Sequence, residues 1–157
     1  MTDADTQQDL ASLFCFGAYG LNRAFGRFYH AAFSETGLTY PKFVTLMALD
    51  EAGPMTVSEL SARASVEPNT LSPLLKKMAS FDLITRERAE EDERRVVLTI
   101  TDTGRAVLQR AHAVALEGFA ALGLDADEVE TALRFLHEVR KRVDAADPPR
   151  LRLDDIL

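Results

Sequence analysis

The sequence has little cysteine and no long hydrophobic segment, and both absences exclude classes of protein. Cys15 is the single cysteine among 157 residues. A lone thiol cannot close an intrachain disulfide, and no Cys-x-x-Cys pair or Cys/His cluster offers a zinc site. The longest apolar run, residues 13–21, is far shorter than the ~18 residues that suggest a membrane span. We therefore expect a cytoplasmic protein with no metal, cofactor or membrane partner.

Basic residues are also scarce. The chain has 18 Lys and Arg against 25 Asp and Glu, a net charge of −7. This balance argues at first against nucleic acid, because phosphate contacts need cations. Residues 57–95, however, hold seven basic against eight acidic residues, and the basic ones gather as Lys76, Lys77, Arg86, Arg88, Arg94 and Arg95. A local cationic surface is therefore compatible with the acidic total.

The first half of the chain shows helical periodicity. Apolar residues recur at three- and four-residue steps over residues 10–33, which predicts one long amphipathic helix that Gly37 ends. Pro41 is placed to open a second helix, over residues 43–49. Thr56 and Glu59 have the spacing of a capping box for a short helix over residues 57–64.

An apolar stripe of Leu71, Leu74, Leu75 and Met78 predicts the next helix. A proline deep in a helix costs ~3 kcal/mol or more, so this helix is expected to begin near Asn69 or Thr70, with Pro73 close to the first turn. Two β-prone segments follow, residues 83–88 and 96–100, around the charged residues 89–95. They predict a hairpin with a long polar tip.

Two more helices are expected after the hairpin. Asp102 is a plausible cap for one that extends to Gly123, and Asp125 for one that ends before Pro148. The element order predicts a mainly α fold with a small β-hairpin: a winged helix-turn-helix core between N- and C-terminal dimerisation helices. The apolar stripes of the chain ends are too extensive for one small domain to cover, so a two-fold homodimer is expected.

The expected organisation has four segments. They are an N-terminal dimerisation and sensing helix (1–37), the winged helix-turn-helix DNA-binding core (38–101), the C-terminal dimerisation helices (102–147) and a tail (148–157).

One helix face and the hairpin tip carry groups suited to DNA. Amide, hydroxyl and ammonium side chains are the mixture that a helix needs in the major groove. Asp92 could hold Arg94 extended toward a minor groove, whose negative potential attracts arginine. A solvated helix face and an exposed salt-bridged turn are the plainer alternatives. The candidate DNA-binding residues are Asn69, Thr70, Ser72, Lys76, Lys77, Arg86, Asp92, Arg94 and Arg95.

The three tyrosines of the chain all lie in the same segment as Cys15. Cys15 and Tyr19 share a helix face, whereas Tyr29 is fourteen residues away, or ~21 Å along a straight helix. An antiparallel copy that crosses near Asn22 would bring Cys15 beside the partner's Tyr29; a kink at the helix glycines is the competing explanation. The candidate redox-sensing residues are Cys15, Tyr19, Tyr29 and Tyr40. The hydroxyls of Tyr29 and Tyr40, with the helix N-terminus, could donate hydrogen bonds to a thiolate, whereas the neighbouring phenylalanines would favour the neutral thiol. A buried structural cysteine is the plain alternative.

These motifs carry a family resemblance. Residues 57–103, with Thr70–Lys77 and Asp92–Arg95, resemble the winged-helix core of the MarR family of regulators. Phe14-Cys15-Phe16, the tyrosines and Thr39-Tyr40-Pro41 resemble its organic hydroperoxide sensor (OhrR) branch. The resemblance implies a dimeric repressor of double-stranded DNA that releases a palindromic operator when the cysteine is oxidised.

The sequence departs from this branch at three places. Glu67-Pro68-Asn69 replaces an Asp-Ser-Gly type of turn, which leaves the base preference open. Lys42 stands where glutamine is often found. The tail from Arg150 has no counterpart.

The geometry of two crossed helices would keep the two Cys15 thiols of a dimer apart. Oxidation by organic hydroperoxide is then expected to give a sulfenic acid, followed by a mixed disulfide with a low-molecular-weight thiol or by overoxidised acids. Two alternatives stay open: a repressor released by a small apolar or phenolic ligand, with Cys15 structural, and a one-cysteine peroxidase. We expect a regulator and not an enzyme, because His30 is fifteen residues from Cys15 and no catalytic constellation surrounds the thiol.

Overall fold

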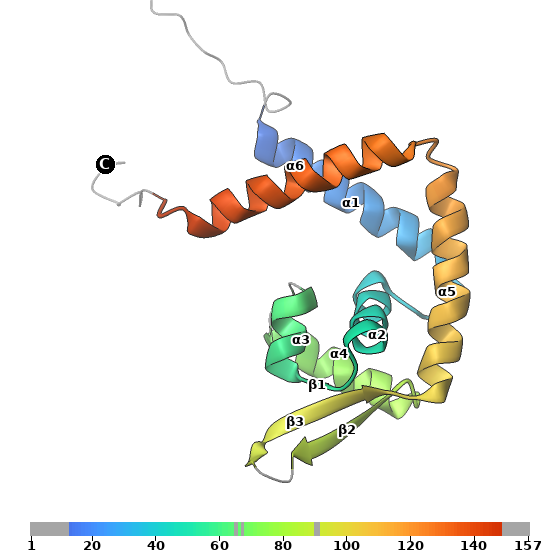
Figure 1. Cartoon of the computed structure of the whole chain (residues 1–157). Helices are drawn as coiled ribbons and strands as arrows, with labels where there is room; N and C mark the ends of the chain where they lie inside the picture. Colours follow the sequence, from blue (N-terminus) through green and yellow to red (C-terminus); the bar gives the residue numbers. More distant parts are fainter. Residues whose placement is uncertain (1–12, 65, 67, 90–91, 149–157) are drawn as a thin grey trace, which may run out of the picture. The chain divides into compact units, whose positions relative to one another are not determined.

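A computed structural model describes residues 13–64, 66, 68–89 and 92–148 of the chain. The chain forms two compact units, residues 1–118 and 119–157. Six helices and three strands are found in the described part (Figure 1). In chain order they are α1 (Phe14–Ala32), α2 (Tyr40–Ala52), β1 (Met55–Thr56), α3 (Val57–Ala64), α4 (Pro68–Ser80), β2 (Ile84–Ala89), β3 (Asp92–Ile100), α5 (Asp102–Ala120) and α6 (Ala126–Ala145).

The predicted fold class is confirmed. Helices α3 and α4 form a helix-turn-helix, and the β2–β3 hairpin follows as the wing (Figure 1). The first helix is confirmed as one uninterrupted element, although it ends at Ala32, five residues before Gly37, which has φ +65° in the following turn. Pro41 lies in the first turn of α2, as predicted.

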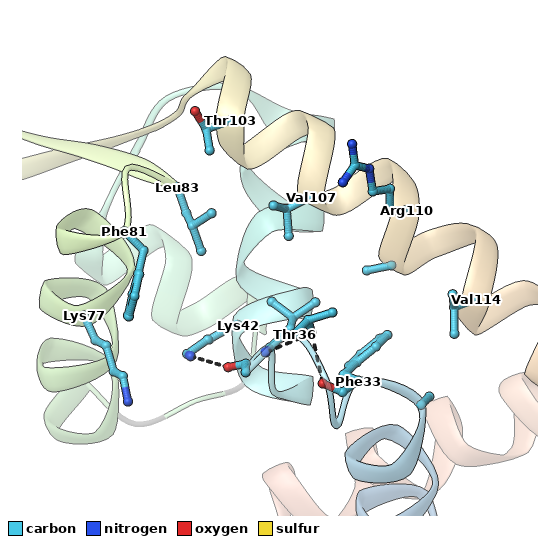
Figure 2. A pocket seen from close by; sticks show the side chains of 14 residues that line it. Phe33, Thr36, Lys42, Lys77, Phe81, Leu83, Thr103, Val107, Arg110 and Val114 are labelled. Atoms are coloured by element: carbon cyan, nitrogen blue, oxygen red, sulfur yellow. Dashed lines mark hydrogen bonds between the residues drawn. The ribbon is translucent and has the colours of Figure 1, made fainter.

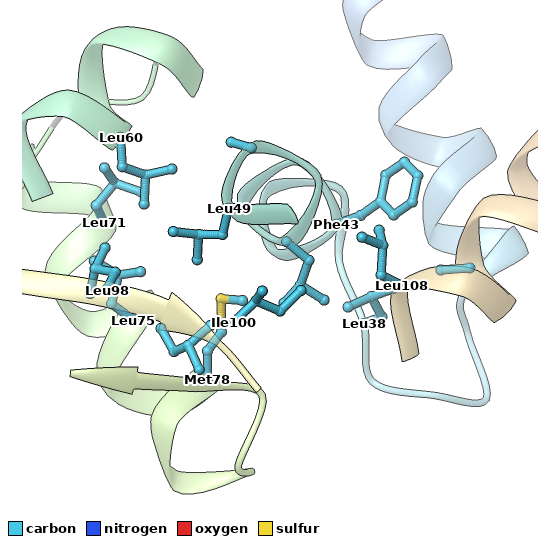
Figure 3. Packing of buried hydrophobic residues seen from close by; sticks show 14 of the residues in the cluster. Leu38, Phe43, Leu49, Leu60, Leu71, Leu75, Met78, Leu98, Ile100 and Leu108 are labelled. Carbon is cyan, nitrogen blue, oxygen red and sulfur yellow. The ribbon is translucent and has the colours of Figure 1, made fainter. Parts of the chain in front are cut away.

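The core of the first unit joins α2, α3, α4 and the sheet. Its fully buried apolar members are Leu46, Leu49, Leu60, Leu71, Leu75, Met78 and Leu98. Figure 3 labels all of them except Leu46. Leu71, Leu75 and Met78 belong to the apolar stripe predicted for α4. Residues at these spacings share one side of a helix, so burial of the stripe leaves the opposite face of α4 turned toward solvent.

The sheet has one more strand than predicted. Its order is β1-β3-β2, and β1 pairs antiparallel with β3 at Met55 and Leu98. Strand β1 is only two residues long, between Pro54 and α3. Such a short strand shows no alternation of apolar and polar residues, so sequence periodicity could not reveal it. The strand ties the start of α3 to the wing.

The prediction of a long polar tip on the hairpin is wrong. Strand pairing continues to Ala89 and Asp92, with a β-bulge between Arg88 and Ala89. Residues 90 and 91 alone stand between the strands, and they lie outside the described residues. Backbone hydrogen bonds hold antiparallel strands together whatever the side chains are, so charged residues extend the ladder beyond the apolar part.

The junction before α5 also differs from the expectation. Asp102 is the first residue of α5, and the cap is Thr101, whose Oγ1 accepts from the Gly104 N–H at 2.9 Å. The Thr101 hydroxyl donates in turn to the Asp82 carbonyl at 2.5 Å, and Thr103 Oγ1 donates to the Asp82 carboxylate at 2.9 Å. Asp82 adopts φ 55°. These bonds fasten the turn after α4 to the start of α5.

The second unit contains α6. Asp125 caps it as predicted, with a complete capping box in which Glu128 N–H donates to Asp125 at 2.8 Å. The helix stops at Ala145, shortly before Pro148. Large apolar side chains of this unit are exposed, among them Leu133, Phe135 and Val143. No helix among the described residues is long and apolar enough to cross a membrane.

Candidate nucleic-acid interface and thiol site

Hydrogen bonds hold both the start of α3 and the turn that leads from α3 to α4. Thr56 N–H donates to Glu59 Oε2 at 2.7 Å and Glu59 N–H donates to Thr56 Oγ1 at 3.3 Å, which confirms the predicted capping box at the start of α3. Ser61 Oγ donates to the Val66 carbonyl at 2.7 Å, and Val66 N–H donates to the Ser61 carbonyl at 3.2 Å. These bonds fix the direction in which α4 leaves the turn.

Helix α4 presents the predicted polar face to solvent. The side chains on this face are exposed: Asn69, Thr70, Ser72, Lys76 and Lys77. They offer amide and hydroxyl groups at the N-terminal end and ammonium groups toward the C-terminal end. Amides and hydroxyls hydrogen-bond to base edges, and ammonium groups bind phosphates, so the face has both functions that a major-groove helix needs.

Pro73 lies within α4. The helix begins at Pro68, one residue before the expected start, and Pro73 is its sixth residue, in the second turn. Pro68 occupies the first helical position, which tolerates proline because the N–H there has no partner in the helix. Pro73 has no N–H, so the carbonyl of Asn69, four residues earlier, lacks its helical donor.

Arg86 and Arg95 of the wing differ in their exposure to solvent. Arg95 is exposed. Arg86 pairs with Leu98 in the ladder and so lies on the same sheet face as the core residue Ile84. Arg86 is accordingly half-buried, and its Nε is buried without a hydrogen bond in the described structure. The side chains of Asp92 and Arg94 lie outside the described residues, so their predicted pairing stays a prediction.

Glu59 connects the wing with the helix-turn-helix. The pKa of its carboxyl is lowered, first by the Thr56 backbone hydrogen bond, then by the Thr56 hydroxyl, and to a lesser extent by the positive charge of Arg95. The positive charge of Arg95 in the wing therefore also stabilises the carboxylate that caps α3.

The thiol is at the start of α1. Cys15 is exposed and is the second residue of the helix. Leu13, the residue before the helix, makes no side-chain cap hydrogen bond. A helix N-terminus favours negative charge, which suits a thiolate. One turn later, Tyr19 Oη accepts from Arg23 Nη1 at 3.0 Å, and the Arg23 guanidinium lies 5.7 Å from the Tyr19 ring centroid.

The other two tyrosines meet at the far end of α1. The ring centroids of Tyr29 and Tyr40 lie 4.5 Å apart. The Tyr29 ring also packs against the rings of Phe28, Phe33 and Phe43. Burial, and then the nearby Tyr40, raise the pKa of Tyr29 above 10.0. Because α1 is uninterrupted, Tyr29 lies ~21 Å along the helix from Cys15. Within one chain the structure thus places Cys15 and Tyr19 toward the start of α1 and the Tyr29–Tyr40 contact at its other end, so the four residues do not form one site.

Two features of the first unit were absent from the sequence expectations. Arg23 engages Tyr19, a pairing that the i, i+4 spacing could have suggested. A cavity of about 440 Å³ lies between the end of α1 and helices α2, α4 and α5 (Figure 2). Its wall includes Lys42 and Lys77. Among the residues that the structure describes, no three His, Cys, Asp or Glu side chains are grouped so that they could hold a metal ion.

Comparisons with known proteins agree on one class. Residues 27–111 match the family model described as "Transcriptional regulator SarA/Rot". The regulator MgrA of Staphylococcus aureus is 34% identical over 134 residues, which cover 85% of this chain and 91% of MgrA.

Solved structures agree with this class. AbfR of Staphylococcus epidermidis has been determined bound to DNA in a reduced and in an overoxidised form. The reduced form is 31% identical, with a TM-score of 0.68, and the match covers 85% of this chain and 94% of AbfR. The overoxidised form is 30% identical, with a TM-score of 0.67 over the same shares. A mutant of MarR from E. coli is 25% identical, with a TM-score of 0.64, over 81% of this chain and 96% of MarR.

Proposed function

The chain belongs to the SarA/Rot family of MarR-type, DNA-binding transcriptional regulators, and we propose that it is a homodimeric repressor with an oxidant-sensing thiol. In this proposal organic hydroperoxide or a related oxidant converts Cys15, and the cytoplasmic repressor then releases a palindromic operator. The observation that carries the proposal is an exposed Cys15 in the first turn of α1, on a helix whose other end holds the Tyr29–Tyr40 pair.

The proposed DNA surface combines α4 with the wing. Asn69, Thr70, Ser72 and Lys76 would enter the major groove, and Arg94 and Arg95 would reach the adjacent minor groove, with Asp92 orienting Arg94. Lys77 lies at the edge of this surface and would bind a phosphate. The half-buried Arg86 would reach a phosphate only if its side chain turned outward. The exposure of the α4 residues and of Arg95 supports this assignment.

The proposed dimer uses the chain ends. Phe14, Phe16 and Leu21 on α1 are 55%, 41% and 50% exposed, and the apolar residues of α6 are exposed as well. Water contact at so many large apolar side chains is unfavourable by ~25 cal/mol per Å² of apolar surface, so burial against a second copy would stabilise the fold. The proposed segments are 1–37 and 102–147 for dimerisation and sensing, 38–101 for DNA binding, and the tail 148–157.

The sensing step would use both copies. If the two α1 helices cross antiparallel, Cys15 of one chain lies beside the partner's Tyr29. The raised pKa of Tyr29 keeps its hydroxyl protonated near neutral pH, so it can donate a hydrogen bond to a thiolate or sulfenate. The two thiols stay at opposite ends of the crossing. A mixed disulfide with a small thiol, and not an intersubunit disulfide, is therefore the proposed product.

The AbfR structures sharpen the test of this proposed switch. This relative was crystallised on DNA both reduced and overoxidised. We infer for the present chain that a bulky mixed disulfide, more than small sulfinic or sulfonic oxygens, drives operator release, because only a bulky group must move the packed α1 helices.

The experiment begins with an operator selected from a random-sequence DNA library. Wild type and Cys15→Ser are titrated on it with organic hydroperoxide, in the presence and absence of a small thiol, and each sample is weighed as intact protein. We expect release of wild type when its mass shows one thiol adduct, and no release of Cys15→Ser. Ala24→Ser, an exposed change on the same helix, should behave as wild type. Release of Cys15→Ser by hydroperoxide would overturn the proposal.

A further inference from the structure

Lys42 is the least exposed of the basic residues that line the cavity. The residue is 9% exposed, whereas Lys77 and Arg110, the other basic residues that line the cavity, are exposed. Lys42 follows Pro41 in the first turn of α2, and its Nζ donates to the Gly37 carbonyl at 2.7 Å (Figure 2). That hydrogen bond fixes the amine at a defined place in the wall.

The surroundings of this amine are apolar and cationic. Phe33, Leu38, Leu83 and Val107 belong to the wall, and none of its described residues is Asp or Glu. The pKa of Lys42 is lowered, first by burial and then by the positive charge of Lys77. Both causes act in the same direction and increase the share of neutral amine, the form with a free lone pair.

We propose that Lys42 is a reversible covalent binding site for small apolar aldehydes. A lysine that is desolvated, or that lies beside another cation, is the arrangement that activates amines toward carbonyl compounds. A cavity of about 440 Å³ is within the size range of small-molecule sites, and its apolar wall would hold the hydrocarbon part of the aldehyde.

The reaction is a condensation without any change of oxidation state. The Nζ lone pair attacks the carbonyl carbon, and the proton lost from nitrogen passes through solvent to the carbonyl oxygen. The carbinolamine so formed then loses its hydroxyl group and the remaining nitrogen-bound proton together as water, which leaves a carbon–nitrogen double bond. The hydrocarbon chain would lie between Lys77 and Phe81 near the end of α4 and Val107 on α5 (Figure 2).

The test uses the full chain carrying Cys15→Ser, so that no thiol competes for the probe. Limiting hexanal is added at neutral pH, imines are fixed with cyanoborohydride, and the labelled lysine is identified by intact mass and peptide mapping. We expect one reduced hexyl group on Lys42, at several-fold the labelling of Lys76, an exposed lysine of α4. Unfolding in urea before labelling should remove the preference. Lys42→Arg, which keeps the charge, should abolish the label, and Lys76→Arg should not.

Several results would overturn the site. They are equal labelling of all lysines in the folded protein, labelling centred on Lys77, and an unchanged label in folded Lys42→Arg. Protection of Lys42 by hexanoate at the concentration of hexanal would assign the cavity to carboxylates instead. The Cys15→Ser chain with Lys42 intact, labelled before and after unfolding, decides the question even if Lys42→Arg does not fold. The readout involves neither the operator nor Cys15, so it can fail without affecting the proposed function.

Discussion

The Tyr29 and Tyr40 rings lie 4.5 Å apart with an angle of 31° between their planes, and this contact joins the C-terminal half of α1 to the first residue of α2. Phe33 and Phe43 extend the same aromatic group into the core. A proposed sensor residue of α1 is thus packed directly against the helix that supports the DNA-binding core. A change in the position of Tyr29 would therefore displace Tyr40 at the start of α2.

Tyr40→Phe should lower the pKa of Tyr29 part of the way back toward 10.0, because Tyr40 is the smaller of the two causes of its rise and burial remains. A spectrophotometric pH titration of tyrosinate measures this. Since the folded pKa is raised, the stability that neutral Tyr29 provides is complete below pH 10.0 and is lost as pH rises through the folded pKa. Tyr19→Phe, at the other end of α1, should leave the Tyr29 transition where it is.

Thr56→Ala should lower the free energy of unfolding by about 1 kcal/mol, because it removes the hydroxyl that caps α3. Urea denaturation gives the value, and Thr56→Ser should retain most of the stability. The lowered pKa of Glu59 also makes stability depend on pH. The stabilisation by the ionised carboxylate is present above the usual pKa of 4.5 and is lost as pH falls through the folded pKa. Equal stability of the Ala and Ser variants would show that the cap contributes nothing.

Gly104→Ala should destabilise the protein by about 2 kcal/mol or more, as overpacking against fixed backbone does. A Cβ at this position would lie 2.1 Å from the Leu83 carbonyl oxygen, which cannot move without disturbing the junction of β2 and α5. Gly26→Ala, where a Cβ meets nothing within 4 Å, is the matched change. Thermal unfolding should show a clearly lower Tm for the first variant alone.

Lys76→Ala should weaken binding to all DNA sequences and reduce the slope of log affinity against log salt concentration by about 0.9, the value for one lost phosphate contact. Lys141→Ala, which removes the same charge from an exposed position on α6, should leave the slope unchanged. Salt titrations of operator binding by the two variants provide the comparison. The same slope in both would remove Lys76 from the DNA surface.

The helices and the winged arrangement could be predicted because their signals are local. The stripe of Leu71, Leu75 and Met78 and the capping residues Thr56 and Asp125 lie within a few residues of the elements they define, and all are confirmed. Strand β1 and the charged part of the wing could not be read in this way. The pairing of β1 depends on β3, far along the chain from Met55. The pairing of the charged wing residues depends on backbone hydrogen bonds, which the side-chain types do not reveal.

The candidate site was predictable in its residues more than in its geometry. Exposure of the α4 face follows from burial of the opposite stripe, so its five polar residues could be named from sequence. Burial of Lys42 depends on a cavity formed by four separate segments, and the inward position of Arg86 depends on the register of β2 against β3. No local pattern encodes either contact.

Asp82 gives the first unit a mechanical property. Its carbonyl and carboxylate accept hydrogen bonds from Thr101 and Thr103, on either side of the start of α5, while its own backbone closes the turn after α4. The turn after α4 and the first turn of α5 are therefore fastened to the same residue. We expect a displacement of α5 to carry the end of α4 with it, so a movement of the dimerisation helices would reach α4 through Asp82.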